Sequence, residues 1–115
     1  MKIKIRKPVH PGAILEEHYI KPLHLNLQKL ATHLGIARNT LFKIREGKAN
    51  ITASLALSLA EAFDTSPHLW LNLQQKYDLW IEENAKAHAH VRSIFKNGFL
   101  EKLQHSEGVL RIATA

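Results

Sequence analysis

Gly35 lies at the centre of residues 26–47, the segment that most constrains the fold of this chain. The apolar side chains on either side of it are Leu30, Ala31, Leu34, Ile36, Leu41 and Ile44. Their helical spacing predicts two short helices that each bury one face against a common core. A glycine at this point is typical of the left-handed turn after a helix C-terminus. With Asn26 as a cap and Gly47 as a stop, the pattern predicts a helix-turn-helix.

The outer face of the second predicted helix is polar and basic. It carries Arg38, Asn39, Thr40, Phe42, Lys43 and Arg45. Arginine, asparagine and lysine pair with guanine or adenine edges in the major groove of DNA, and threonine also donates to bases or phosphates. We therefore expect this helix to read DNA. The alternative is a structural helical hairpin with a solvated basic face, because a helix–glycine–helix pattern by itself has low specificity.

The expected DNA contacts divide into two kinds. Arg38 and Asn39, with Lys43 one turn later, are expected at base edges in the major groove. The residues expected along the sugar-phosphate backbone are Thr40, Arg45 and Lys48. The complete predicted DNA-binding set is Gln28, Arg38, Asn39, Thr40, Phe42, Lys43, Arg45 and Lys48.

Charge is distributed unevenly along the 115 residues, whose net charge is +6. Residues 1–12 carry four Lys or Arg and no acidic side chain, and residues 26–50 carry five against Glu46. Residues 51–84 carry five Asp or Glu against Lys76. A polyanionic partner is expected to meet the basic hairpin, with the acidic segment facing away. The basic arm at residues 1–7 is either a solvated tail or a contact to phosphate or a partner.

The helix signals predict an all-α fold of five helices. The expected ranges are 11–21, 27–34, 38–46, 53–63 and a helix from about 67 that continues past Ala89. Proline opens the first and last of these, and Thr52 caps the fourth. We expect residues 1–92 to form the helix-turn-helix domain, with 67–92 as a dimerising helix. Residues 93–115 are expected to form a weakly ordered extension or a short helix interrupted by Gly98.

Several functional classes lack support in the sequence. The chain has no cysteine, which excludes disulfides and Cys-ligated metal sites. Its eight histidines form no i, i+4 pair beside a carboxylate, so we expect neither a metal nor a cofactor. The serines have no base partner or nucleophile-elbow motif, so no catalytic residue is predicted. No secretory signal or membrane-spanning run is recognised, so a cytoplasmic protein is expected.

Three signatures in order resemble the HigA-type antitoxins, in the lambda-repressor-like branch of helix-turn-helix regulators. They are His10-Pro11-Gly12-Ala13-Ile14-Leu15, Leu30-Ala31-Thr32-His33-Leu34-Gly35-Ile36, and Ser66-Pro67-His68-Leu69-Trp70-Leu71-Asn72-Leu73-Gln74. The resemblance covers residues 8–79. It implies five packed helices, a homodimer, a palindromic DNA operator and a partner toxin that is a small messenger-RNA-cleaving ribonuclease. In this sequence Ala37 replaces the usual Ser or Thr cap of the recognition helix.

An apolar stripe on the last predicted helix extends beyond the part of the helix that a small domain can bury in its core. Trp70 and Leu73 are expected in the core, whereas Tyr77, Trp80 and Ile81 are expected at a dimer interface. The preferred interpretation is therefore a dimeric repressor that is the antitoxin of a type II pair with a HigB-like toxin. A solitary regulator without a toxin is the second interpretation, and a small basic ribonuclease is the third.

Overall fold

The computed structural model describes residues 7–85 and 91–104. Over these ranges the chain is helical, without strands, as the sequence predicts. The elements are α1 (Pro11–Leu15), the π-helical turn η1 (Glu16–Ile20), α2 (Leu27–Leu34), α3 (Arg38–Arg45), α4 (Ala53–Phe63), α5 (Pro67–Ala85) and α6 (Phe99–Gln104). The chain forms two compact units, residues 1–84 and 85–115. With α1 and η1 counted as one continuous helix, the described part of the first unit is the expected five-helix domain.

The first helix differs from a regular α-helix in its second half. His10 caps α1, because its Nδ1 accepts from the Gly12 N–H at 2.9 Å. Burial lowers the pKa of His10, which favours the neutral ring that this acceptor requires. After Leu15 the backbone widens, and the Lys21 N–H donates to the Glu16 carbonyl at 3.0 Å. This π-helical turn was not predicted, since its side-chain spacing differs little from that of an α-helix over one turn.

The turn between α2 and α3 has the predicted geometry. Asn26 caps α2 by accepting from the Lys29 N–H at 3.0 Å. Gly35 is left-handed at φ 74°, and the Ile36 N–H donates to the Ala31 carbonyl at 3.0 Å. Together with the bond from the Gly35 N–H to the Thr32 carbonyl, this is a Schellman ending. The turn therefore sets the direction in which α3 leaves α2.

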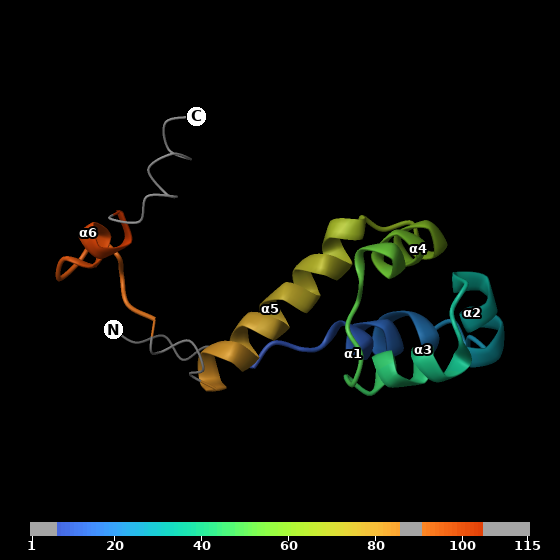
Figure 1. Ribbon diagram of the computed structural model, residues 1–115. Helices are drawn as coiled ribbons and strands as arrows, with labels where there is room; N and C mark the ends of the chain where they lie inside the picture. Colours follow the sequence, from blue (N-terminus) through green and yellow to red (C-terminus); the bar gives the residue numbers. More distant parts are fainter. Residues whose placement is uncertain (1–6, 86–90, 105–115) are drawn as a thin grey trace, which may run out of the picture. The chain divides into compact units, whose positions relative to one another are not determined.

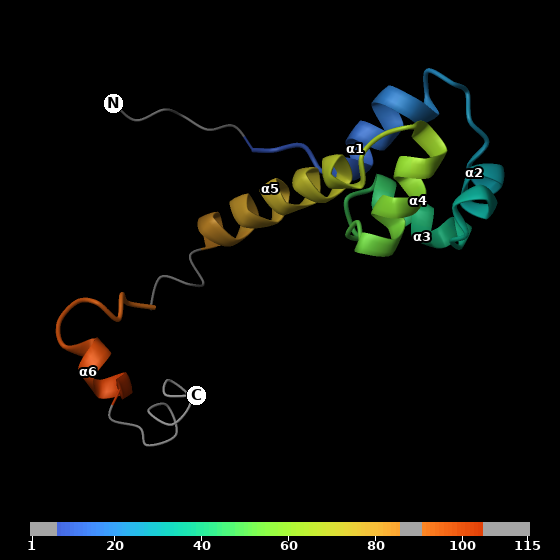
Figure 2. The same ribbon diagram turned by 90° about the horizontal axis from the view of Figure 1, so that it is seen from above.

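The core of the first unit draws on every helix from α1 to α5. Trp70, at the start of α5, is completely buried, and its indole N–H donates to the Thr65 hydroxyl at 2.8 Å. The other members of the buried apolar cluster are Leu15, Ile20, Leu30, Ala31, Leu34, Leu41, Ile44, Ile51, Leu55, Ala56 and Leu59. Figures 1 and 2 show α1 to α4 gathered into a bundle from which α5 extends. All six apolar residues flanking Gly35 pack in or against this core, as expected.

The far end of α5 leaves the core. Gln74 is the last buried residue of this helix, and residues 81–85 are exposed. The expected continuation past Ala89 falls on residues 86–90, outside the described ranges, and residues 91–93 are not helical. The first compact unit ends at residue 84, whereas the sequence placed the boundary after residue 92. The last turn of α5 has no core to pack against, and the domain boundary after residue 92 stays a prediction.

The second unit contains α6, a short helix that starts immediately after Gly98 at φ 73°. A short helix interrupted at Gly98 is one of the two forms expected for residues 93–115. The part of that expectation that concerns residues 105–115 lies outside the described residues. None of the helices in the described ranges combines the length and apolar character needed to cross a membrane.

Candidate nucleic-acid interface

Helix α3 is the helix that the sequence predicts to read DNA, and we call it the reading helix. It separates its buried and exposed faces as the sequence predicts. Leu41 and Ile44 are each only 1% exposed and face the core. The exposed residues of α3 are Arg38, Asn39, Thr40, Phe42 and Lys43. In the described part of the chain, Arg38 and Lys43 form no ion pair with a carboxylate. Both cations are therefore available to phosphate or to base edges.

The C-terminal end of α3 is held by the backbone of α1. A Cβ added to Gly12 would overlap the backbone carbonyl of Ile44. Only glycine therefore lets α1 approach α3 this closely. His10 and Pro11 begin the helix that carries Gly12, so the His-Pro-Gly opening positions the reading helix.

Arg45, predicted as a phosphate contact at the edge of the reading helix, forms an ion pair within the chain, and its contact with DNA stays a prediction. Its Nε donates to Glu16 Oε2 at 2.6 Å, and the two side chains are only 22% and 19% exposed. The hydrogen bond from Arg45, with its positive charge, lowers the pKa of Glu16. The pair joins η1 to the end of α3, so Arg45 holds the reading helix in place. Sequence reasoning missed Glu16, because nothing in a spacing of 29 residues signals the contact.

Two further predicted DNA contacts lie outside α3. Gln28 is exposed in the first turn of α2, beside the Asn26 cap. Lys48 is exposed in the loop after α3, where its Nζ lies 3.5 Å from a Glu46 carboxylate oxygen. Ion pairs this exposed contribute little to stability, so Lys48 can exchange Glu46 for a phosphate at small cost.

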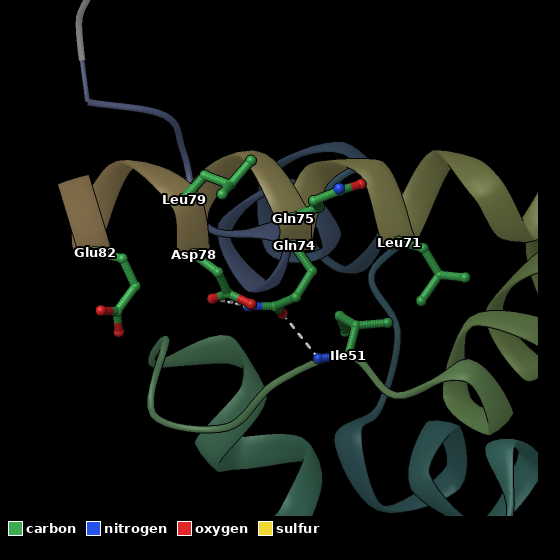
Figure 3. A pocket seen from close by; sticks show the side chains of 7 residues that line it. All are labelled: Ile51, Leu71, Gln74, Gln75, Asp78, Leu79 and Glu82. Carbon is green, nitrogen blue, oxygen red and sulfur yellow. Dashed lines mark hydrogen bonds between the residues drawn. The ribbon is translucent and has the colours of Figure 1, made fainter. Parts of the chain in front are cut away.

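Gln74 connects the loop after α3 to α5. Its Oε1 accepts from the Ile51 N–H at 2.8 Å, and its Nε2 donates to Asn50 Oδ1 at 3.2 Å and to Asp78 Oδ1 at 2.9 Å. Figure 3 shows this side chain reaching from α5 to Ile51, at the edge of a pocket of about 330 Å³. The pocket is also lined by Leu71, Gln75, Leu79 and Glu82. Gln74 ends the third signature, but no local pattern in the sequence signals this contact across 23 positions.

The three residues predicted at a dimer interface are Tyr77, Trp80 and Ile81, and they differ from one another in contacts and exposure. Tyr77 packs edge-on against His10 of the same chain, with ring centroids 4.9 Å apart. Lys7 Nζ lies 5.6 Å from the Tyr77 ring centroid and 5.7 Å from that of Trp80, which places the end of the basic arm on this face. Ile81 is 37% exposed. Leu79, which the prediction omitted, is 53% exposed.

The described residues contain no group of three or more His, Cys, Asp or Glu side chains able to hold a metal ion. The polar groups of this surface are instead those that pair with nucleic acid. A short helix with a polar, basic outer face, attached through a glycine turn to a supporting helix, defines a helix-turn-helix DNA-binding domain.

Comparisons with known proteins agree with this class. The model of the helix-turn-helix family matches residues 18–70. A helix-turn-helix-type transcriptional regulator of Haemophilus influenzae is 44% identical over 70% of this chain and 76% of its own length. The antitoxin HigA-1 of Vibrio cholerae is 35% identical over 69% of this chain and 74% of its own. The antitoxin GraA, solved in complex with its operator, is 34% identical with a TM-score of 0.71, covering 81% of this chain and 96% of GraA. This chain belongs to the lambda-repressor-like helix-turn-helix regulators that include the HigA-type antitoxins.

Proposed function

We propose that this protein is a sequence-specific transcriptional repressor and the antitoxin of a type II toxin–antitoxin pair. It binds a palindromic operator in the cytoplasm, represses its own operon and neutralises a HigB-like ribonuclease toxin. The observation that carries the proposal is the exposed outer face of α3, where Arg38 and Lys43 have no carboxylate partner in the described part of the chain. The names of HigA-1 and of GraA with its operator support the antitoxin role.

The proposed repressor is a homodimer. One recognition helix covers only a few base pairs, and a two-fold pair places two such helices about 34 Å apart, one turn of DNA. Ile81, which is exposed, and Trp80, which is partly exposed, give α5 apolar side chains beyond its last buried residue that are suited to pairing. The surplus of acidic residues in 51–84 supports a position for this face away from phosphate.

Two measurements test the proposal. Footprinting on the DNA upstream of the gene is expected to reveal one protected palindrome, which competitor DNA of unrelated sequence does not remove. Co-expression with the product of the adjacent short reading frame is expected to yield a stable complex and to relieve that product's toxicity. Absence of a protected site would overturn the repressor role, and unrelieved toxicity would overturn the antitoxin role.

A solitary regulator is the second candidate. The relative from Haemophilus influenzae, which is more similar in sequence than HigA-1, is described as a transcriptional regulator and not as an antitoxin. A protected operator without any adjacent toxin gene would favour this alternative. The third interpretation, a basic ribonuclease, predicts RNA cleavage by the purified protein, whereas the repressor model predicts that RNA stays intact.

A further inference from the structure

Phe42 leaves a large apolar ring on the reading face of α3. The side chain is 49% exposed, although it belongs to a helix whose other two large apolar residues are 1% exposed. Arg38 and Asn39 lie four and three positions earlier, so the three share one face of the helix. Together they line a hollow of about 380 Å³. An apolar ring thus adjoins two side chains suited to reading bases.

The flanking charges indicate which kind of partner covers this ring. Lys43 follows Phe42 directly, and Arg38 lies one turn before it, with both side chains exposed and without carboxylate partners in the described ranges. An apolar protein surface would leave these cations desolvated and unpaired. A polyanion that presents an apolar group between its phosphates can pair its phosphates with both cations and pack the apolar group against the ring. In the major groove, the C5-methyl of thymine is such a group, and phenylalanine is among the residues that contact it.

We propose that the hollow formed by Arg38, Asn39 and Phe42 receives the C5-methyl of one thymine in each operator half-site. Arg38 or Asn39 then pairs with a neighbouring purine, guanine for arginine and adenine for asparagine. Phe42 is thus a specificity-determining residue that reads thymine through its methyl group. This inference rests on the proposed operator binding and adds the chemistry of one base to it.

Deoxyuridine provides the test, because it differs from thymidine only in lacking the C5-methyl. Operator duplexes are selected from a random pool with the wild-type protein, and each thymine is then replaced singly by deoxyuridine. Binding is measured by fluorescence anisotropy at fixed salt concentration. At one thymine per half-site the Kd is expected to rise about fourfold, the loss that corresponds to one buried methyl-sized group. At the other thymines the Kd is expected to stay constant.

Two variants test whether the rise in Kd on loss of the thymine methyl group comes from the Phe42 ring. In Phe42→Ala, binding is expected to be weaker, and the same replacement by deoxyuridine is expected to have no further effect. In the matched control Lys43→Ala, binding is also weaker, but the fourfold methyl effect persists. Because Phe42 is half exposed, Phe42→Ala is expected to melt near the wild-type temperature, which thermal unfolding checks.

Two results would overturn the inference while operator binding itself survives. One is a selected duplex in which no thymine responds to deoxyuridine. The other is a methyl effect that is equally large in Phe42→Ala, which would assign the thymine contact to another residue. If the wild-type protein enriches no sequence from the pool, the proposed repressor function fails, and this inference fails with it.

Discussion

Arg45 and Glu16 form an ion pair that joins the end of the reading helix to η1. The Nε–Oε2 distance of 2.6 Å and the low exposure of both side chains make this a partly buried, charge-assisted hydrogen bond. Glu16→Gln keeps the size of the side chain but removes its charge. We expect the variant to lose about 1 kcal/mol of unfolding free energy at pH 7. Urea unfolding measures the loss.

The sign of the pH dependence follows from the lowered pKa of Glu16. A carboxyl whose pKa is lower in the folded state stabilises the fold fully above its unfolded pKa, which is about 4.3 for glutamate. That stabilisation is lost as the pH falls through the folded pKa. Wild type and Glu16→Gln are therefore expected to differ at pH 7 and to converge as the pH falls through the lowered pKa of Glu16. Equal stability at pH 7 would show that the pair contributes nothing in solution.

Arg38 is the residue for which a loss of base discrimination is predicted. It is exposed in the first turn of α3 and has no carboxylate partner in the described ranges. Removal of a bidentate base contact costs about 1–3 kcal/mol of discrimination. Arg38→Ala is thus expected to weaken operator binding and to accept base changes that the wild type rejects. Competition between the operator and its single-base variants measures both effects.

Lys48→Ala is the matched control for Arg38→Ala. Lys48 is exposed after α3 and is expected to contact only phosphate. Its loss should weaken binding to all sequences alike and reduce the slope of log K against log salt by about one unit. If Arg38→Ala also weakens all sequences alike, Arg38 is a phosphate contact and its assignment as a base-reading residue is wrong.

At the scale of elements, the turn before α3 requires glycine because of its backbone conformation, and not because a side chain would lack space. A Cβ at Gly35 would meet no atom within 4 Å, yet φ is +74°. Gly35→Val is therefore expected to cost about 1–3 kcal/mol, because a β-branched residue tolerates positive φ poorly. Gly35→Asn adds a side chain of similar size that tolerates this conformation, and we expect a smaller loss. Melting temperatures rank the two, and equal values would contradict the proposed origin of the cost.

Gly12 presents the opposite case, in which space and not conformation requires glycine. A Cβ there would overlap the Ile44 carbonyl, so Gly12→Ala forces α1 away from α3. Overpacking of this kind costs about 1–3 kcal/mol, and the reading helix loses part of its support. We expect a lower melting temperature together with weaker operator binding. A variant with wild-type stability would show that α1 shifts without strain.

These elements also show what the sequence can predict. The bounds of α2, α3 and α4 follow from local signals, namely the Asn26 and Thr52 caps and the glycine turn, and the structure agrees with them to within one residue. The contacts of Glu16 with Arg45 and of Gln74 with Ile51 join residues 29 and 23 positions apart. Such pairs depend on how the helices pack, which no local pattern contains. The exposed face of α3 could therefore be predicted from the sequence, but not the contacts that hold this helix in place.

At the scale of the whole molecule, Gln74 links the reading helix to the proposed dimer face. It accepts from the loop that follows α3 and donates to Asp78, one turn further along α5. Tyr77 in the same stretch of α5 packs against His10, which caps the helix that supports α3. The part of α5 between Gln74 and Asp78 is thus anchored to the elements that orient α3, immediately before the residues proposed to pair. A partner that docks there would set the spacing between two reading helices.

The last prediction concerns this assembly. Trp80 is partly exposed and Ile81 is 37% exposed, and both lie beyond the last buried residue of α5. Two glutamates at these positions would replace apolar side chains with like charges on both copies and prevent them from pairing. Trp80→Glu combined with Ile81→Glu is therefore expected to give a folded monomer with much weaker operator affinity. Light scattering measures the mass, and circular dichroism checks that the helices persist.

Asn72→Glu combined with Gln75→Glu provides the charge-matched control, because both positions are exposed and polar on the same helix. This control is expected to stay dimeric and to bind the operator at nearly wild-type affinity. A dimer that survives the changes at Trp80 and Ile81 would move the interface elsewhere, most directly to residues 92–115. A wild-type protein that is monomeric at micromolar concentration and still binds one half-site tightly would contradict the dimeric-repressor model itself, because a single reading helix covers too few base pairs for such affinity.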